Sequence, residues 1–405
     1  MSAGERRPPR AVACDVRLAG FADRASVERA QAWVDGQACR RVAVEVAVAD
    51  CVGRVPGAPL AASGPFPLAD RAGEDGYAVR SAETVGASAY DPVLLRLLGA
   101  GEPLPPGGAA LVEAGAALPP GADAILSFDA AQAAGPTLEV FAAVAEGSGV
   151  ERAGQQLRVG AALTYGDRPI RPHEAALLAA AGVARLGVLE RPRVRLVIAG
   201  AKAVAGAGGG DAHGPMLRAL IERDGGALEP GEPGAGLREA LRRAAAAPGA
   251  DLLIATGRTG TGPDDEAPLV LAEAGRLELH GIALRPGGST GMGLVGALPV
   301  ILLPGDPLAC LCAYELFAGR LVRRLGGRDP ESPHARREAE VGRKIVSAVG
   351  SVDVCQVRLA AGRVEPLGVA ESGGLPAAGR ADGFVVVPAA LEGYPPGARV
   401  TVHLY

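Results

Sequence analysis

The sequence predicts a multi-domain protein that combines one α/β domain, built on a parallel sheet, with separate β domains. Two observations lead to this prediction. The chain has 405 residues, of which 48% are apolar and 21% charged, which is enough for two or three compact domains. Strand, loop and helix patterns alternate regularly only between residues 191 and 326, whereas the flanking stretches contain short strands broken by glycine and proline.

Composition excludes several classes of protein. The net charge of −4 and the high apolar content argue against a disordered chain. No apolar run approaches the ~18 residues that span a membrane, and no basic stripe with aromatics suggests nucleic acid as a partner. The N-terminal MSAGERRPPR lacks the apolar stretch of a secretory signal, so we expect a cytoplasmic protein.

The first 185 residues predict a helical segment and an irregular β domain. Residues 1–20 form a polar leader without a clear period. Ser26 is a good N-cap, and Val27, Ala30 and Val34 recur at helical spacing after it. Alternating residues 42–48 read as a strand, and short apolar runs between proline and glycine clusters fill 92–145. A second helix is predicted over 172–181.

The middle of the chain predicts the parallel sheet. Buried strands are expected at 193–198, 251–255 and 300–303, and each is followed by a loop and a helix. The expected helices cover 215–223, 237–247, 269–274 and 308–325. Ligands of such sheets bind at the carboxyl ends of the strands, here the loops 199–210, 256–265 and 304–307.

The last 70 residues or so predict a small β domain. A polar, proline-containing linker covers 328–335. After it, the sequence predicts strands around 344–349, 354–360, 383–388 and 399–405.

The glycine-rich loop TGRTGTG, residues 256–262, is the strongest candidate for ligand binding. Small residues let a ligand approach the backbone, and successive N–H groups can hold an anion such as a phosphate. A tight turn without a ligand is the alternative. Asp264, Asp265 and Glu266 follow, and they read either as acids at a helix start or as contacts to a metal or polar ligand.

Two other segments have ordinary structural explanations when each is taken alone. Residues 303–307, LPGDP, read as a rigid strand–helix turn with Asp306 near the helix cap, although the helix start also offers free N–H groups. The acidic pair Glu74 and Asp75 before Gly76 reads as a turn entering a strand.

The order of these segments resembles the MoeA/gephyrin-E family, the molybdopterin molybdenumtransferases. The resemblance runs from about residue 26 to residue 405. It rests on GPFPLADRAGEDGYAVRS, AGAALPPGADAIL, TGRTGTGPDD, LPGDPLA and the C-terminal ADGFVVVP and PPGARVTVHLY. The family's "DSN" loop corresponds to residues 211–213, and its "KPGKP" segment corresponds to RPGGS, residues 285–289.

This resemblance implies an elongated, four-domain homodimer whose α/β domain is similar to the stand-alone MogA and MoaB proteins. The implied domains are a discontinuous N-terminal linker/helical domain (1–45 and 146–185), an inserted β domain (46–145), a molybdopterin-binding-like α/β domain (186–327) and a C-terminal β domain (328–405). The implied reaction inserts molybdenum from molybdate into adenylylated molybdopterin and releases AMP, with Mg²⁺ as the expected metal. Other molybdenum-cofactor proteins are possible partners.

Residues matching the family's motifs give the candidate site. Catalytic candidates are Asp75, Asp265 and Arg285, and metal candidates are Asp75 and Asp211. The candidates for binding the pterin or its phosphate are Thr256, Gly257, Arg258, Thr259, Gly260, Thr261, Gly262, Pro304, Gly305, Asp306, Pro307 and Ser372.

Departures from the family's motifs leave more than one function open. The family's acids after the first sheet strand are absent from residues 200–203, and its two KPGKP lysines are Arg285 and Gly288 here. Because Mg²⁺ needs oxygen ligands, a site stripped of acids binds it poorly. The chain is therefore a divergent molybdenumtransferase, a degenerate paralogue that binds a pterin, nucleotide or partner protein without metal transfer, or an enzyme for another phosphorylated substrate.

Overall fold

The predicted sheet is present in the middle of the chain and has a parallel core. The computed structural model describes residues 15–39, 41–99, 102–166, 168–198, 211–229, 236–246, 249–368 and 374–405. The six strands lie in the order β12-β11-β13-β17-β16-β14. Their bounds are β11 Arg193–Ile198, β12 Ala227–Leu228, β13 Leu252–Thr256, β14 Arg276–His280, β16 Gly291–Val295 and β17 Leu298–Leu303.

Four neighbouring strands of this sheet are parallel, and two are not. β12, β11, β13 and β17 pair in parallel, whereas β16 and β14 pair antiparallel at one side. Glycine and charged residues interrupt the apolar pattern of these two strands, so the sequence did not indicate them. A tight turn at Gly296, whose φ is +61°, joins β16 to β17 and makes that pair a hairpin.

Helices cover both faces of the sheet, as the continuous apolar strands predicted. Alternate residues of β13 point to opposite cores: Leu252 and Ile254 belong to one cluster, and Leu253 and Ala255 belong to the other. The first cluster includes residues of α4 (His213–Arg223) and of a long helix made of α7 (Pro307–Ala313), a π-helical turn (Tyr314–Ala318) and α8 (Gly319–Leu325). The second includes residues of α5 (Leu237–Ala246) and α6 (Ala267–Ala274).

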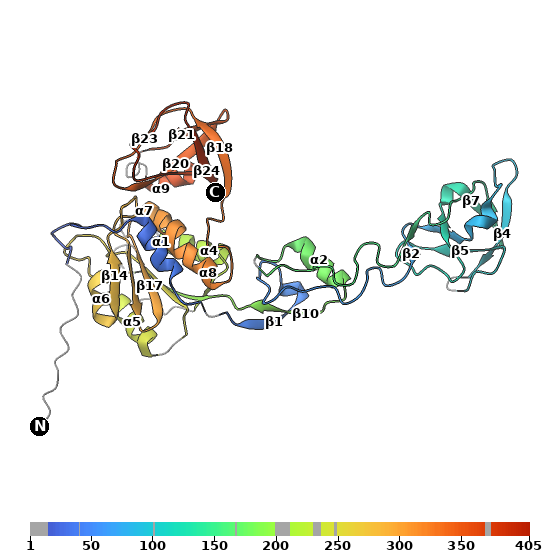
Figure 1. Cartoon of the computed structure of the whole chain (residues 1–405), viewed down its shortest axis with the longest axis horizontal. Coiled ribbons are helices and arrows are strands. Elements are labelled where there is room, and N and C mark those ends of the chain that lie inside the picture. Colours follow the sequence, from blue (N-terminus) through green and yellow to red (C-terminus); the bar gives the residue numbers. More distant parts are fainter. Residues whose placement is uncertain are drawn as a thin grey trace, which may run out of the picture.

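The first helix packs against this α/β region (Figure 1). α1 spans Val27–Asp35, and the Ser26 hydroxyl accepts a hydrogen bond from the Arg29 N–H, as the sequence predicted for its start. Its buried face joins the first core cluster, and Arg320 on α8 forms an ion pair with Asp35. The helix therefore lies apart from α2 (Pro172–Ala180), with which residues 1–45 were expected to share a domain.

Beyond the α/β region the chain runs outward and returns beside itself. β1 (Ala43–Ala47) pairs antiparallel with β10 (Arg185–Leu189), and α2 packs close by around Leu178. The outer end is a six-stranded sheet in the order β6-β3-β5-β4-β8-β7. Its strands are β3 Gly76–Val79, β4 Val93–Leu98, β5 Gly108–Val112, β6 Ala124–Leu126, β7 Ala131–Ala134 and β8 Thr137–Val140, and β2 Arg71–Ala72 and β9 Val150–Glu151 pair at its base.

The C-terminal β region is attached to the α/β region by a shared strand. Its sheet has the order β15-β20-β21-β18-β24-β22, and β15 is contributed by residues Leu284–Arg285 of the α/β region. The other strands are β18 Ala335–Val341, β20 Val352–Ala360, β21 Arg363–Pro366, β22 Gly383–Val387 and β24 Arg399–Leu404, with a small β19/β23 pair (Ile345–Val346, Gly393–Tyr394) and helix α9 (Gly374–Arg380).

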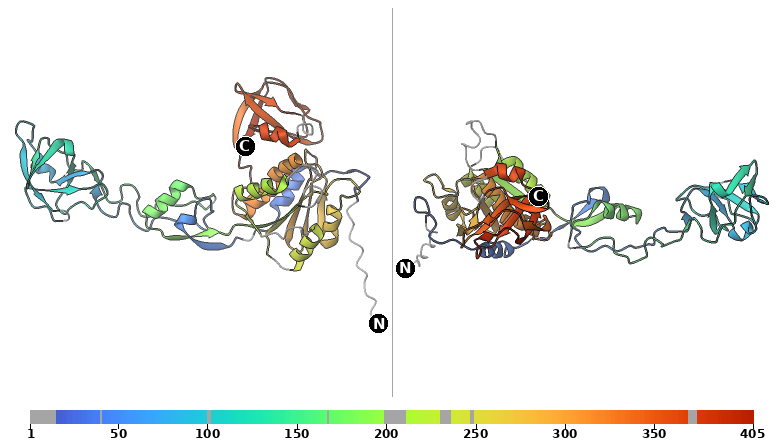
Figure 2. Two further views of the ribbon diagram at one scale, coloured as in Figure 1. Left: turned by 180° about the vertical axis from the view of Figure 1, so that it is seen from behind. Right: turned by 90° about the horizontal axis from the view of Figure 1, so that it is seen from above.

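The whole molecule is elongated, with the outer sheet at one end and the α/β and C-terminal regions together at the other (Figures 1 and 2). A multi-domain α/β plus β architecture is thus confirmed. The bounds of the four domains stay a prediction.

Candidate functional site

Three loops meet at the carboxyl edge of the central sheet. Ile198, Thr256 and Leu303 are paired in register across β11, β13 and β17, so the residues after them leave the sheet side by side. The loop after β11, 199–210, lies outside the described residues. The loop after β13 (256–265) and the turn after β17 (304–307) are described, and Asp211 begins the segment leading into α4.

The β13 and β17 loops are clasped together at their base. The buried Thr256 hydroxyl donates to the Pro304 carbonyl at 2.9 Å, and the Gly257 N–H donates to the Leu303 carbonyl at 3.0 Å. A Cβ on Gly305 would stand 3.3 Å from the Gly257 Cα, and Gly257 has a φ of +93°. Gly305 thus lies close against the neighbouring loop, and Gly257 adopts a backbone conformation that favours glycine.

Above this clasp the loop leaves a run of backbone donors open. Within the described part of the chain, the N–H groups of Arg258, Thr259, Gly260 and Thr261 have no hydrogen-bond partner. We call these four N–H groups the amide cradle. Arg258, the first residue of the run, holds the left-handed conformation, with φ of +56°. Consecutive unpaired N–H groups attract an anion.

Asp265 shapes the cradle. Its Oδ2 accepts a hydrogen bond from the Gly262 N–H at 2.7 Å, and a Cβ on Gly260 would stand 2.7 Å from the same oxygen. The carboxylate thus folds the end of the loop over itself. The catalytic role of Asp265 stays a prediction.

Thr259 is fixed by residues from the neighbouring β14–β16 connection. Its side chain is buried, its Oγ1 lies 3.1 Å from Ser289 Oγ, and its carbonyl oxygen lies 2.9 Å from His280 Nε2. Burial lowers the pKa of His280 below its ordinary value of 6.5. The sequence did not indicate a role for His280, because a lone histidine 21 residues after Thr259 gives no signal of this contact.

Both arginines among the candidate site residues, Arg258 and Arg285, have carboxylate partners. Arg258 pairs with Glu266 at 3.0 Å. Arg285 reaches into the C-terminal region, where it makes two hydrogen bonds, 2.8 and 2.7 Å long, to the buried carboxylate of Asp353. Arg285 therefore helps to join the two regions, as does the pairing of β15 with β20.

The other predicted residues lie in structural positions or elsewhere. Asp306 is the N-cap of α7, where its side chain accepts the Ala309 N–H at 2.8 Å, and Pro307 is the first helical residue. Asp211 accepts the N–H groups of His213 and Gly214. Asp75 precedes β3 in the outer sheet and accepts the Ala114 N–H. Ser372 lies outside the described residues.

The described residues do not fit a magnesium site. No group of three or more His, Cys, Asp or Glu side chains converges among them. Asp75 and Asp211, the two metal candidates, belong to distant parts of the chain, and each accepts backbone N–H groups. The sequence of 199–210 adds no carboxylate. Mg²⁺ prefers several oxygen ligands in an octahedral arrangement, which these side chains do not supply.

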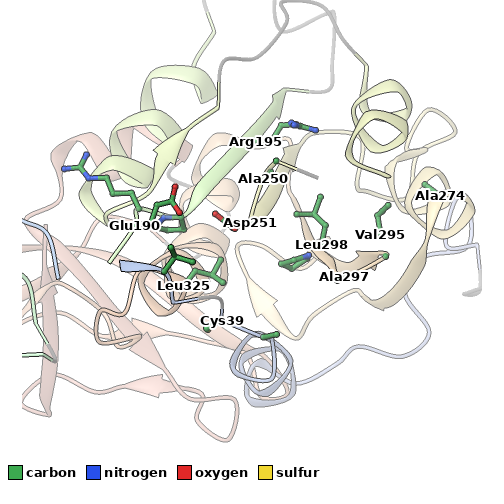
Figure 3. Close-up of a pocket in the computed structure, with 17 residues that line it drawn as sticks. Cys39, Glu190, Arg195, Ala250, Asp251, Ala274, Val295, Ala297, Leu298 and Leu325 are labelled. Carbon is green, nitrogen blue, oxygen red and sulfur yellow. The ribbon is translucent and has the colours of Figure 1, made fainter. Parts of the chain in front are cut away.

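A hollow of about 630 Å³ lies at the opposite, amino edge of the sheet (Figure 3). Asp251, Leu298 and the residues 190–192 that lead into β11 line it. Two of its polar side chains are already bonded: Asp251 Oδ2 accepts the Arg193 N–H at 2.7 Å, and Arg195 pairs with Glu229 at 2.6 Å. The hollow contains none of the predicted site residues.

The structure thus brings together the loop 256–262, Asp265 and the turn 304–307, and it adds Ser289 and His280 to them. Asp75 lies in the outer sheet, at the other end of the molecule. Among the described residues, no helix combines the length and the apolar character needed to cross a bilayer.

Comparisons with known proteins agree along the length of the chain. Residues 25–182 match the family "MoeA N-terminal region (domain I and II)", residues 197–324 match "Probable molybdopterin binding domain", and residues 338–405 match "MoeA C-terminal region (domain IV)".

Similar proteins carry related names. Molybdopterin molybdenumtransferase 2 of Mycobacterium tuberculosis is 28% identical over 74% of this chain and 78% of its own length. Molybdopterin molybdenumtransferase of Staphylococcus aureus is 24% identical over 89% and 91%. A crystal structure of the molybdopterin biosynthesis MoeA protein of Pyrococcus horikoshii is similar with a TM-score of 0.72 and 27% identity, covering 94% of this chain and 99% of that one.

Proposed function

Since this chain belongs to the MoeA family, we propose that it acts in molybdenum cofactor biosynthesis as a molybdopterin molybdenumtransferase. Its substrates are molybdate and adenylylated molybdopterin, and AMP is released. The amide cradle carries this proposal, because it offers four unpaired N–H groups to an anionic group at the carboxyl edge of the sheet.

The residues around the cradle have positioning roles in this proposal. Thr256 and Gly257 anchor the loop to the β17 turn, and Asp265 folds its far end. The phosphate of the ligand lies on the cradle with its oxygens toward the N–H groups. The ligand therefore binds mainly through the backbone, and side chains next to it select for charge and shape.

We derive no step through Mg²⁺, since the described carboxylates do not converge. The same observation, together with the pairing of Arg258 and Arg285, favours a second candidate function. In it, the chain binds a phosphorylated pterin or a nucleotide at the cradle without transferring metal.

A homodimer is also part of the proposal. Asp75 lies in the outer sheet, at the opposite end of the molecule from the cradle (Figure 1). If Asp75 contributes to the site, it therefore does so from a second copy of the chain. Light scattering at micromolar concentration should give twice the monomer mass, and a monomer there would remove Asp75 from the site.

The deciding experiment combines the purified protein with adenylylated molybdopterin and measures AMP release with and without molybdate. Molybdate-dependent release of AMP supports the transferase. Tight binding of the nucleotide with no release supports the second function. Absence of both binding and release overturns the assignment of the cradle.

A further inference from the structure

The cradle lacks a free cation among the arginines considered so far. Arg258 has Glu266 as its partner, and Arg285 has Asp353 and further contacts. A guanidinium that already faces a carboxylate attracts a phosphate less strongly, because the two charges largely cancel at a distance. Unpaired positive charge near the cradle must therefore come from another residue.

A segment N-terminal to α1 crosses this edge. The Leu18 N–H donates to the Thr261 carbonyl at 2.7 Å, directly on the candidate loop. Phe21 packs edge-on against His280, with 5.0 Å between ring centroids. Ala25 exchanges backbone hydrogen bonds with residues 281 and 283. The segment is thus attached both to the loop and to the connection that holds Thr259.

Arg24 is the cation that this segment brings to the site. Its side chain is exposed, and its guanidinium carbon lies 5.6 Å from the centre of the Phe21 ring. Within the described part of the chain it has no carboxylate or hydrogen-bond partner. Its Nη1 lies 3.8 Å from the point where a Cβ on Gly288 would stand.

Gly288 links this guanidinium to the cradle. The next residue, Ser289, contacts the hydroxyl of Thr259, whose N–H is one of the four in the cradle. Gly288 also occupies the position at which the KPGKP motif has its second lysine, so the chain lacks a charged side chain exactly where Arg24 approaches from another segment.

We propose that Arg24 is an anion-binding residue of the site and that it replaces the positive charge absent from position 288. The inference rests on the proposed function, since it takes the cradle as the place where the ligand's phosphate binds. Arg24 suits this task because its five donors can contact two phosphate oxygens at once, while Phe21 supports the flat face of the guanidinium.

The two positions should therefore be exchangeable. A Cβ on Gly288 would lie 3.3 Å from the Leu284 carbonyl oxygen and 3.4 Å from that of Ile282, so a side chain fits there after a small shift. A lysine at 288 would extend from the point that the Arg24 guanidinium now approaches. The charge of this lysine would then reach the same phosphate from the connection between β14 and β16.

The experiment measures AMP binding by calorimetry at two salt concentrations, for the full chain and five variants. The variants are Arg24→Gln, Arg24→Lys, Gly288→Lys, the double variant Arg24→Gln/Gly288→Lys, and Arg29→Gln as the matched control. Arg29 is an exposed arginine on α1, five residues further along the chain. Arg24 and Arg29 are exposed, so the unfolding temperatures of their variants should stay close to that of the unmodified chain. Gly288 is half-buried, so the unfolding temperature of Gly288→Lys measures how well the added side chain is accommodated.

We expect Arg24→Gln to weaken AMP binding about tenfold and to reduce its salt dependence, because a charge-assisted contact is lost. Arg24→Lys should keep most of the affinity, the double variant should regain it, and Arg29→Gln should change neither quantity. The loss of salt dependence together with the rescue by lysine separates charge from a merely structural effect.

Two results would overturn the inference in distinguishable ways. If the chain binds AMP and Arg24→Gln behaves like Arg29→Gln, Arg24 does not bind the anion, while the proposed function still stands on molybdate-dependent AMP release. If the unmodified chain neither binds nor releases AMP, the proposed function and the inference both fail.

Discussion

At the carboxyl edge of the central sheet, four consecutive backbone N–H groups have no partner among the described residues. At the amino edge the opposite holds. A hollow of about 630 Å³ is present, but the carboxylate of Asp251 and the guanidinium of Arg195 beside it are bonded to neighbouring parts of the chain.

This difference shows why volume alone is a poor guide to a binding site in this molecule. A ligand gains most from groups whose hydrogen bonds are unmet, since hydrogen bonds within the chain need not be broken first. At the amino-edge hollow, Asp251 and Arg195 already have partners within the chain. The cradle offers unpaired donors.

The largest effect should come from a bulky residue at the carboxyl edge, with the same kind of change at the amino edge as its control. Thr261→Trp should lower the affinity for AMP about hundredfold or more, since losing two hydrogen bonds to a charged group costs about 1.5–3 kcal/mol each. Ala297→Trp, which fills the amino-edge hollow, should leave the affinity unchanged. Calorimetric titration tests both, and the reverse pattern would move the site to the hollow.

Two aspartates make a matched pair for the second prediction. Asp265 and Asp251 each accept one backbone N–H at 2.7 Å, at opposite edges. Asp265→Ala should weaken AMP binding by about 1–3 kcal/mol because the loop loses its internal hydrogen bond. Asp251→Ala should lower the unfolding temperature without changing AMP affinity. Equal losses of affinity in both variants would mean that Asp265 has no specific effect on the shape of the binding loop.

The third prediction concerns the ion pair between Arg285 and Asp353. Asp353→Asn should lower the free energy of unfolding by about 1–2 kcal/mol, a buried-pair effect reduced because Arg285 is partly exposed. The same change frees charge at the carboxyl edge, so the affinity for AMP should rise severalfold. Thermal unfolding and titration give the two readouts, and a fall in affinity would show that Arg285 contributes only while it is paired.

The smallest effect should be the pH dependence of the carboxyl edge. Burial lowers the pKa of His280 below 6.5, so the folded chain resists protonation more than the unfolded chain does. The contribution of neutral His280 to the free energy of unfolding is complete above pH 6.5, and it is lost as the pH falls from 6.5 toward the lowered pKa. Unfolding temperatures between pH 7.5 and 5.5 should therefore fall less steeply for His280→Gln than for the unmodified chain.

Local structure could be predicted wherever its cause is local. The start of α1 at Ser26 and the capping of α7 by Asp306 follow from side chains bonding to N–H groups three residues away. The packing of α1 on α8 could not be predicted, since the Asp35–Arg320 contact joins residues 285 positions apart. The antiparallel β14 and β16 were missed because glycines and charges hide their period.

The same division applies to the candidate site. The glycine-rich loop could be found because small residues after a buried strand leave the backbone open, which is a sequence-local property. The partners of its arginines could not be found, because Asp353 is 68 residues from Arg285 and belongs to another region. Likewise His280, Ser289 and Arg24 come to the loop only through the packing of separate segments.

The path of the chain through the outer region has a consequence for how this protein can be rearranged. The chain leaves the α2 region at Phe66 and re-enters it at Leu157, and these two residues form a β-bridge with hydrogen bonds of 2.8 and 3.0 Å between their backbones. A two-residue turn can connect such partners. We therefore expect that the residues between Phe66 and Leu157 can be deleted, or exchanged with those of a relative, while both edges of the central sheet remain intact.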